Sequence, residues 1–153
     1  ADRNLDLLIN IWKELIYTKF NTAKLLITPP LNNLANSHNI SFRRTDNQNY
    51  MIEDIKNSRI FLIPGHKAEL FCLAAEEARE LCVPIVTLGI GCLSERIIHE
   101  KTGFAAKNNV EFSNYVIELY KNDDLWNKIR NNLIETRGKN TWCNVAKDLL
   151  AKI

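Results

Sequence analysis

The sequence predicts an α/β domain, in which a mostly parallel sheet lies between two layers of helices in a three-layer, Rossmann-like arrangement. About five short apolar runs alternate with segments whose apolar residues recur at helical spacing, as expected for strands joined by crossover helices. The chain has 153 residues, of which 46% are hydrophobic and 25% charged. These values predict one globular domain spanning residues 1–153.

The charge and cysteine patterns exclude several classes of protein. The formal net charge is +2, and the only adjacent basic pair is Arg43-Arg44, so we expect no nucleic-acid partner. No cysteine pair has zinc or redox spacing, and no apolar run approaches the roughly 20 residues that cross a bilayer. We expect a cytoplasmic protein without a metal or other cofactor. Docking at the cytoplasmic face of a membrane stays open.

The amino-terminal part predicts a helix, two strands and a short helix. The chain opens directly on an amphipathic segment with no strand before it. Its inward face consists of Leu5, Leu8, Ile9, Trp12, Leu15 and Ile16. The next elements are expected to be a strand at 24–28 that ends at Pro29-Pro30, a strand at 40–45 and a helix at 50–57.

The central part predicts strand, loop, helix, strand and a glycine-bearing loop over residues 59–104. Apolar runs at 60–63 and 83–87 form the two strands, and each is followed by a glycine-containing turn. A strand is expected at 103–106, a helix at 110–122, and a helix at 125–137 capped by Asp123-Asp124 and ended by Gly138. A final amphipathic segment is expected to pack into the core through Trp142, Val145, Ala146, Leu149, Leu150 and Ile153.

Two carboxylates mark the central loop and helix. Glu69 follows the turn at Pro64-Gly65, and Glu77 lies eight positions further on, inside a helix expected to begin near Phe71 or Cys72. Loops at the carboxyl ends of parallel strands are where open α/β sheets bind ligands. Two glutamates eight positions apart near a helix are also common in proteins without any functional role. We interpret the neighbouring Glu76 and Glu80 as part of a solvated helix face.

The order of the motifs resembles the carboxyl-terminal, nucleotide-sugar-binding half of GT-B retaining glycosyltransferases of family 4, the glycosyl transferases group 1. The matching elements are Glu69-x7-Glu77-Ala78, Val83-Pro84-Ile85-Val86, Gly91-x3-Glu95-x-Ile97 and Thr102-Gly103. The segment Arg3-Asn4-Leu5-Asp6 is similar to the Lys-Gly-x-Asp segment that opens the first helix of that domain. The resemblance covers nearly the whole chain, in the same order.

The resemblance implies a role for each matching residue. Glu69 would contact the transferred sugar, together with Leu70, Phe71, Cys72 and Leu73, and Glu77 would hold the ribose. A carboxylate at each end suits a nucleotide-sugar, because each end offers vicinal hydroxyls that donate two hydrogen bonds.

The remaining implied contacts lie around the diphosphate and the base. Arg3 and Gly65 would lie near the pyrophosphate, which needs a permanent positive charge. Arg43, Arg44 and Tyr50 fall where the family has its base-binding edge. The resemblance assigns no catalytic residue in this chain and no metal.

The chain departs from the family in two ways. Leu70, Cys72, Cys82 and Cys92 stand where the family has glycine, which bears on donor affinity because a Cβ crowds a close-approaching ligand. The first strand of the domain and the amino-terminal acceptor-binding domain are also missing. The chain is therefore expected to be a fragment or a truncated or diverged protein, and inactive alone.

The resulting hypothesis is the donor-binding domain of a hexosyltransferase. It would use a nucleoside-diphosphate sugar, with retention, to modify a glycan or lipid acceptor, as in glycan or lipopolysaccharide biosynthesis. The alternative is a diverged, non-catalytic module for sugar-nucleotide binding or assembly. An epimerase-like enzyme of the same architecture is disfavoured, because it requires a different carboxylate pattern.

Overall fold

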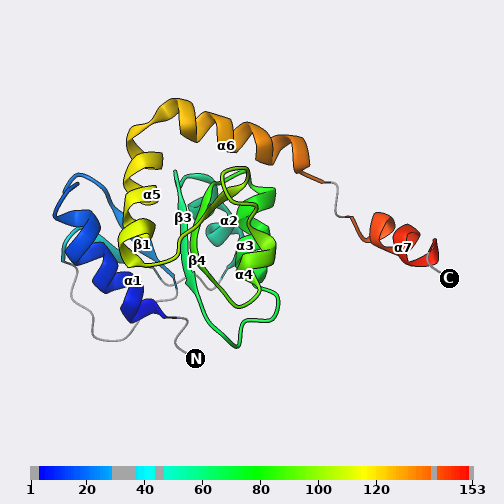
Figure 1. Ribbon diagram of the computed structural model, residues 1–153, viewed down its shortest axis with the longest axis horizontal. Coiled ribbons are helices and arrows are strands. Elements are labelled where there is room, and N and C mark those ends of the chain that lie inside the picture. Colours follow the sequence, from blue (N-terminus) through cyan, green and yellow to red (C-terminus); the bar gives the residue numbers. More distant parts are fainter. Residues whose placement is uncertain (1–3, 29–36, 44–46, 139–140, 152–153) are drawn as a thin grey trace.

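The computed structural model describes residues 4–28, 37–43, 47–138 and 141–151, and Figure 1 shows their arrangement. In chain order the elements are α1 (Leu5–Ile11), the π-helix η1 (Trp12–Tyr17), β1 (Leu25–Ile27), β2 (Ile40–Phe42), α2 (Gln48–Lys56), β3 (Phe61–Gly65), α3 (Leu73–Glu80), β4 (Ile85–Ile90), α4 (Leu93–Arg96), β5 (Gly103–Ala105), α5 (Asn109–Lys121), α6 (Asp123–Thr136) and α7 (Trp142–Leu150).

The described strands pair only in parallel, which confirms the predicted fold class. They form two separate sheets, β1-β2 and β3-β4-β5. Val86 of the central strand β4 lies between Leu62 of β3 and Phe104 of β5. The apolar runs therefore form strands where expected, but the backbone ladder is interrupted between β1 and β3.

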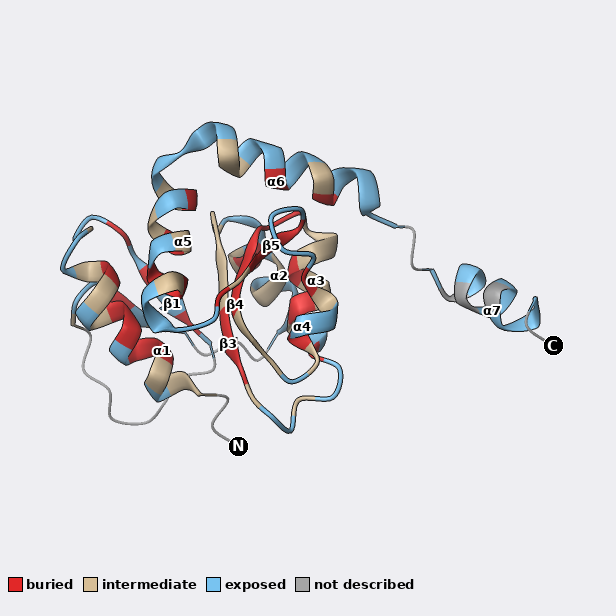
Figure 2. Cartoon of the chain, in the orientation of Figure 1, coloured by how far each residue is buried: buried red, intermediate tan, exposed pale blue. Residues whose placement is uncertain are grey.

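Helices cover both faces of the sheets (Figure 2). One core lies under α1, η1, α5 and α6, and it includes Val86 and Phe104. The other lies under α2, α3 and α4, and it includes Ile63 and Ile85. Because successive strand residues point to opposite faces of the sheet, Ile85 and Val86 are buried in different cores. The three-layer prediction is confirmed.

The start of α6 differs from the predicted cap. Asn122, and not the Asp123-Asp124 pair, caps the helix by accepting a hydrogen bond from Leu125 N–H at 3.0 Å. Asp123 instead forms an ion pair with Arg59 at 2.5 Å. Asparagine and aspartate are about equally effective as caps. Residue type alone therefore does not decide which of these neighbours caps α6.

The expectation that the last helix packs into the core was wrong for the residues whose side chains are described. Leu149 and Leu150 of α7 are 60% and 72% exposed, and α7 stands clear of the other helices in Figure 1. An amphipathic pattern shows that a helix has an apolar face, but not which surface covers it.

Helix α5 begins with a reciprocal cap that responds to pH. Asn108 Oδ1 accepts from the Glu111 amide at 2.9 Å, while the Glu111 carboxylate accepts from the Lys107 amide at 2.6 Å and the Tyr115 hydroxyl at 3.0 Å. The Lys107 amide, followed by the Tyr115 hydroxyl, lowers the pKa of Glu111. A carboxyl group with a lowered folded-state pKa adds stability above its unfolded-state pKa and loses it as the pH falls through the folded-state pKa.

We expect Glu111→Gln to lower the thermal midpoint by a few degrees at neutral pH, because glutamine carries no charge for the Lys107 amide and the Tyr115 hydroxyl. The difference from the wild-type chain should shrink in acid, as wild-type Glu111 becomes protonated. Thermal melts across the acid range measure it. Glu118→Gln, at an exposed position of the same helix, is the control, and an equal effect in both variants would contradict the capping role.

Candidate functional site

The loops after β3 and β4 meet at the carboxyl ends of these strands. Gly65 pairs with Ile90 after a shift in register, and the Cys92 amide donates to the Glu69 carbonyl at 3.2 Å. Gly91, at a φ of 69°, lies so close that an added Cβ would be 2.4 Å from the His66 carbonyl oxygen. The β4 loop thus holds the Glu69 loop through direct backbone contact.

The start of α1 joins the same edge. Asn4 precedes the helix with a φ of 59°, and its Nδ2 donates to the carbonyl oxygen of Gly65 at 2.5 Å. In Figure 1 this end of α1 lies on the opposite side of the domain from α6. Gly65 is therefore at the meeting point of three segments. Arg3, the expected pyrophosphate ligand, lies outside the described residues.

Helix α3 begins where the sequence predicted. Cys72 is its cap residue, with a φ of 53°, and makes no capping hydrogen bond with its side chain. Glu77 is the fifth residue of the helix, so it lies one turn beyond the first backbone amides. Such amides carry a partial positive charge and face the end of the helix, where an anion can accept hydrogen bonds from them.

The loop that leads into α3 presents apolar side chains to solvent. Leu70 is 89% exposed, and Phe71 and Leu73 are also exposed. The guanidinium of Arg96 lies 4.0 Å from the centre of the Phe71 ring, a cation–π geometry. Of the residues expected around a sugar, only Cys72 is buried.

Glu76 and Glu77 have different surroundings although they are neighbours. The Glu76 carboxylate forms ion pairs with Arg79 at 2.6 Å and with Arg96 at 3.2 Å, and its side chain is 18% exposed. Among the described residues, no hydrogen bond or ion pair involves the carboxylate of Glu77. Glu76 therefore ties α3 to α4, while Glu77 has its acceptor capacity left for a ligand.

The expectation that Glu76 and Glu80 are merely solvated is thus wrong. Glu80 accepts from the Gly138 amide at 3.0 Å and from Arg79 at 3.3 Å. The pairing of Glu76 with Arg79 has a local signal, since residues three apart are neighbours on a helix. The contacts of Glu76 with Arg96 and of Glu80 with Gly138 have none, because their partners come together only when α4 and the end of α6 pack beside α3.

Two of the four residues that replace family glycines keep a glycine-like backbone. Cys72 and Cys82 have φ values of 53° and 58°, whereas Cys92 has a φ of −66°. A positive φ costs an L-residue about 1–2 kcal/mol.

Burial, followed by the charge of Glu69, raises the pKa of the Cys92 thiol.

The residues expected at a base-binding edge contact one another. Arg43 pairs with Asp54 at 2.5 Å, and its guanidinium lies 5.8 Å from the Tyr50 ring centre. None of the described contacts joins Arg43 or Tyr50 to the Glu69 loop. Arg44 lies outside the described residues.

Two further residues were not predicted as parts of this site. Asn4 fixes the start of α1 on Gly65, and Arg96 covers the ring of Phe71. Asn4 carries a weak signal, because asparagine is common directly before a helix. The sequence carries no signal for Arg96, since its contact with Phe71 forms only when α4 packs beside the loop that leads into α3.

The described part of the chain contains no group of three His, Cys, Asp or Glu side chains placed to hold a metal ion. None of its described helices combines the length and the apolar character needed to cross a membrane.

Comparison with known proteins gives one family. The family model for glycosyl transferases group 1 matches residues 2–136. A comparison with curated proteins gives no match. The matched range contains the α3 loop, both carboxylates and every described strand. Because this range is most of the chain, the chain belongs to the glycosyl transferases group 1 family.

Proposed function

We propose that this chain is the donor-binding domain of a GT-B glycosyltransferase of the family 4 type. It takes up a nucleoside-diphosphate sugar, from which a hexose is transferred with retention to a glycan or lipid acceptor. The observation that carries the proposal is the placement of Glu69 and Glu77 on either side of the first turn of α3 in a member of this family.

In this proposal the resemblance to the family gives the two carboxylates different ends of the donor. Glu69 accepts from hydroxyls of the sugar, and Glu77 accepts from the ribose. The amides at the start of α3 receive the diphosphate between them, because an anion is stabilised at a helix amino terminus. Leu70, Phe71 and Leu73 form the side of the sugar site.

The wider protein is also part of the proposal. An amino-terminal acceptor-binding domain completes the cleft, so residues 1–153 alone bind the donor but do not transfer the sugar. The proposed setting is cytoplasmic glycan or lipopolysaccharide synthesis, with peripheral membrane contact through the acceptor side. Arg3 is proposed to bind the pyrophosphate together with Gly65, and Arg43, Arg44 and Tyr50 the base. No metal takes part in this scheme.

Glu77→Gln is expected to weaken donor binding about 10-fold or more, since hydrogen bonds to a charged acceptor contribute about 1.5–3 kcal/mol. Isothermal titration calorimetry with uridine, guanosine and adenosine diphosphate sugars measures the effect. Glutamine keeps the size of the side chain, so the fold should be retained.

The control for this experiment is Glu135→Gln, at an exposed position of α6. This variant should bind the donor as the wild-type chain does. Equal affinity of the Glu77→Gln variant and the wild-type chain for the best donor would remove Glu77 from the ribose site.

A non-catalytic module is the second candidate, and Leu70 and Cys72 favour it. Both carry a Cβ where the resembling family has glycine, and the exposed Leu70 side chain lies in the loop that would approach the sugar. If none of the three classes of nucleotide-sugar shifts the melting temperature at millimolar concentration, the hypothesis of a non-catalytic module replaces that of a donor-binding domain.

A further inference from the structure

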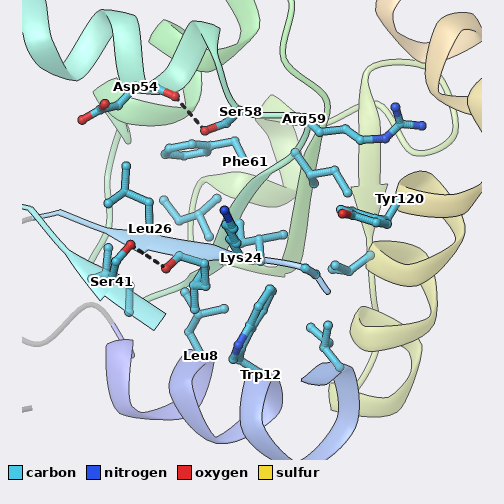
Figure 3. A pocket seen from close by; sticks show the side chains of 18 of the residues that line it. Leu8, Trp12, Lys24, Leu26, Ser41, Asp54, Ser58, Arg59, Phe61 and Tyr120 are labelled. Carbon is cyan, nitrogen blue, oxygen red and sulfur yellow. Dashed lines mark hydrogen bonds between the residues drawn. The ribbon is translucent and has the colours of Figure 1, made fainter. Parts of the chain in front are cut away.

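A cavity of about 1080 Å³ lies between β1 and β3 (Figure 3). Most of the residues that line it are apolar, and several of its polar side chains are engaged within the fold. Ser41 and Ser58 donate to backbone carbonyls at 3.4 and 2.7 Å, while Asp54 and Arg59 form ion pairs. A sugar needs hydrogen-bonding partners for its hydroxyls. The donor sugar is therefore expected at the loop that leads into α3, and not in this cavity.

The ring of Phe71 in that loop is covered on one face by an arginine. The guanidinium carbon of Arg96 lies 4.0 Å from the centre of the ring. This is a contact distance, so the face toward Arg96 is closed to solvent. Phe71 is nevertheless 49% exposed. Its exposed surface therefore lies on the opposite face and on the edge of the ring.

The guanidinium of Arg96 is itself held in place. Its Nη1 donates to Glu76 Oε1 at 3.2 Å, and Arg79 binds the other oxygen of the same carboxylate at 2.6 Å. The side chains of Arg96 and Glu76 are 28% and 18% exposed, so solvent screens this ion pair less than one at the open surface. Through Arg96, the ion pair between α3 and α4 therefore fixes the position of the Phe71 ring.

The backbone on either side of Phe71 is also held. Cys72, the next residue, is 1% exposed, so the loop is anchored in the core directly after the ring. The Glu69 carbonyl, two residues before the ring, accepts from the Cys92 amide at 3.2 Å. Because ring and backbone are both fixed, the open face of Phe71 has a defined position in the site.

A fixed aromatic ring with one open face suits a sugar. A pyranose carries its hydroxyls around its rim, and at least one of its two faces presents mainly C–H bonds. Such a face packs on the electron-rich face of an aromatic ring, while the hydroxyls at the rim donate to a carboxylate. Glu69 lies only two positions before Phe71. The loop therefore contains both kinds of group that a hexose needs.

We propose that the open face of Phe71 stacks on the apolar C–H face of the donor hexose, and that Arg96 is a positioning residue that holds the ring from behind. This inference rests on the proposed function. It favours donors whose sugar has a C–H face uninterrupted by an axial hydroxyl. Arg96 makes no contact with the donor and acts only through the ring.

The test compares binding of the best of the three nucleotide-sugars with binding of its nucleoside diphosphate, which lacks the hexose. Isothermal titration calorimetry should show that nucleotide-sugar affinity falls about 10-fold in Phe71→Leu and about 3-fold in Arg96→Gln. Nucleoside diphosphate affinity should stay unchanged in both variants, because the ring touches only the sugar. An equal loss for the two ligands would show a general loosening of the loop and would overturn the proposal.

Further variants test the role of Arg96 as a positioning residue. The double variant Phe71→Leu, Arg96→Gln should bind the nucleotide-sugar as Phe71→Leu alone does, because Arg96 acts through the ring; additive losses would overturn this role. Phe71→Tyr keeps the ring and should bind as the wild-type chain does. Arg130→Gln is the matched control, since Arg130 lies 5.4 Å from the Trp126 ring centre on α6. A loss in this control equal to that in Arg96→Gln would also contradict the proposal.

The same titrations separate this inference from the proposed function. If the wild-type chain binds none of the three classes of nucleotide-sugar, the proposed function and the stacking role of Phe71 fail together. If the wild-type chain binds one of them and Glu77→Gln weakens that binding, while Phe71→Leu binds it as tightly as the wild-type chain, the proposed function stands and only the stacking role fails.

Discussion

Gly91→Ala is expected to lower the free energy of unfolding by about 2–5 kcal/mol. The new Cβ would lie 2.4 Å from the His66 carbonyl oxygen and 3.0 Å from that of Glu69, at a φ of 69°. Neither oxygen can move without its backbone, so the Glu69 loop must shift. If this loop contacts the donor as proposed, donor affinity should fall together with stability.

The matched control is Gly138→Ala. Gly138 has a φ of 71°, and an added Cβ would find no atom within 4 Å. This variant carries the backbone cost alone, about 1–2 kcal/mol. Urea unfolding of both variants measures the difference. Equal losses of stability would mean that the two loops are not in the tight contact described.

Phe112→Ala should cost about 3–5 kcal/mol, the range for removing a buried aromatic side chain. Phe112 is completely buried in the core beneath α5, together with Leu119 and Ile129. This core joins α1, η1 and α6 to the sheet, so a cavity there weakens several elements at once. Thermal melting and urea unfolding should show a reduced midpoint.

A change on the same helix serves as the comparison for Phe112. Val110→Ala removes apolar atoms from a side chain that is exposed, and surface changes usually stay within about 0.5 kcal/mol. A similar loss in the two variants would contradict the assignment of Phe112 to the core.

Much of the fold follows from the sequence because the strands are short, apolar and separated by strong turn signals. Every predicted strand exists, and α5 begins one residue before its predicted start. The position of α7 did not follow, since the spacing predicted that Leu149 and Leu150 pack into the core and both are exposed. The break between β1 and β3 could not be read from the sequence either, because an apolar run does not reveal its neighbours.

The candidate site was predictable to a different degree. The positions of Glu69 and Glu77 relative to α3 followed from the spacing, since one is in the loop and the other in the helix. The different surroundings of Glu76 and Glu77 could not be predicted, because the ion pair of Glu76 with Arg96 joins α3 to α4. The positive φ of Cys72 did not follow from the residue type, as cysteine usually adopts a negative φ, although the resembling family has glycine at this position.

The attachment of the α3 loop to the segment after β4 bears on the entropy of ligand binding. The Cys92 amide holds the Glu69 carbonyl, and Arg96 lies over the ring of Phe71. A loop fixed at two points has already lost conformational freedom during folding. A ligand that fits its present shape therefore meets a smaller ordering cost than it would on a free loop.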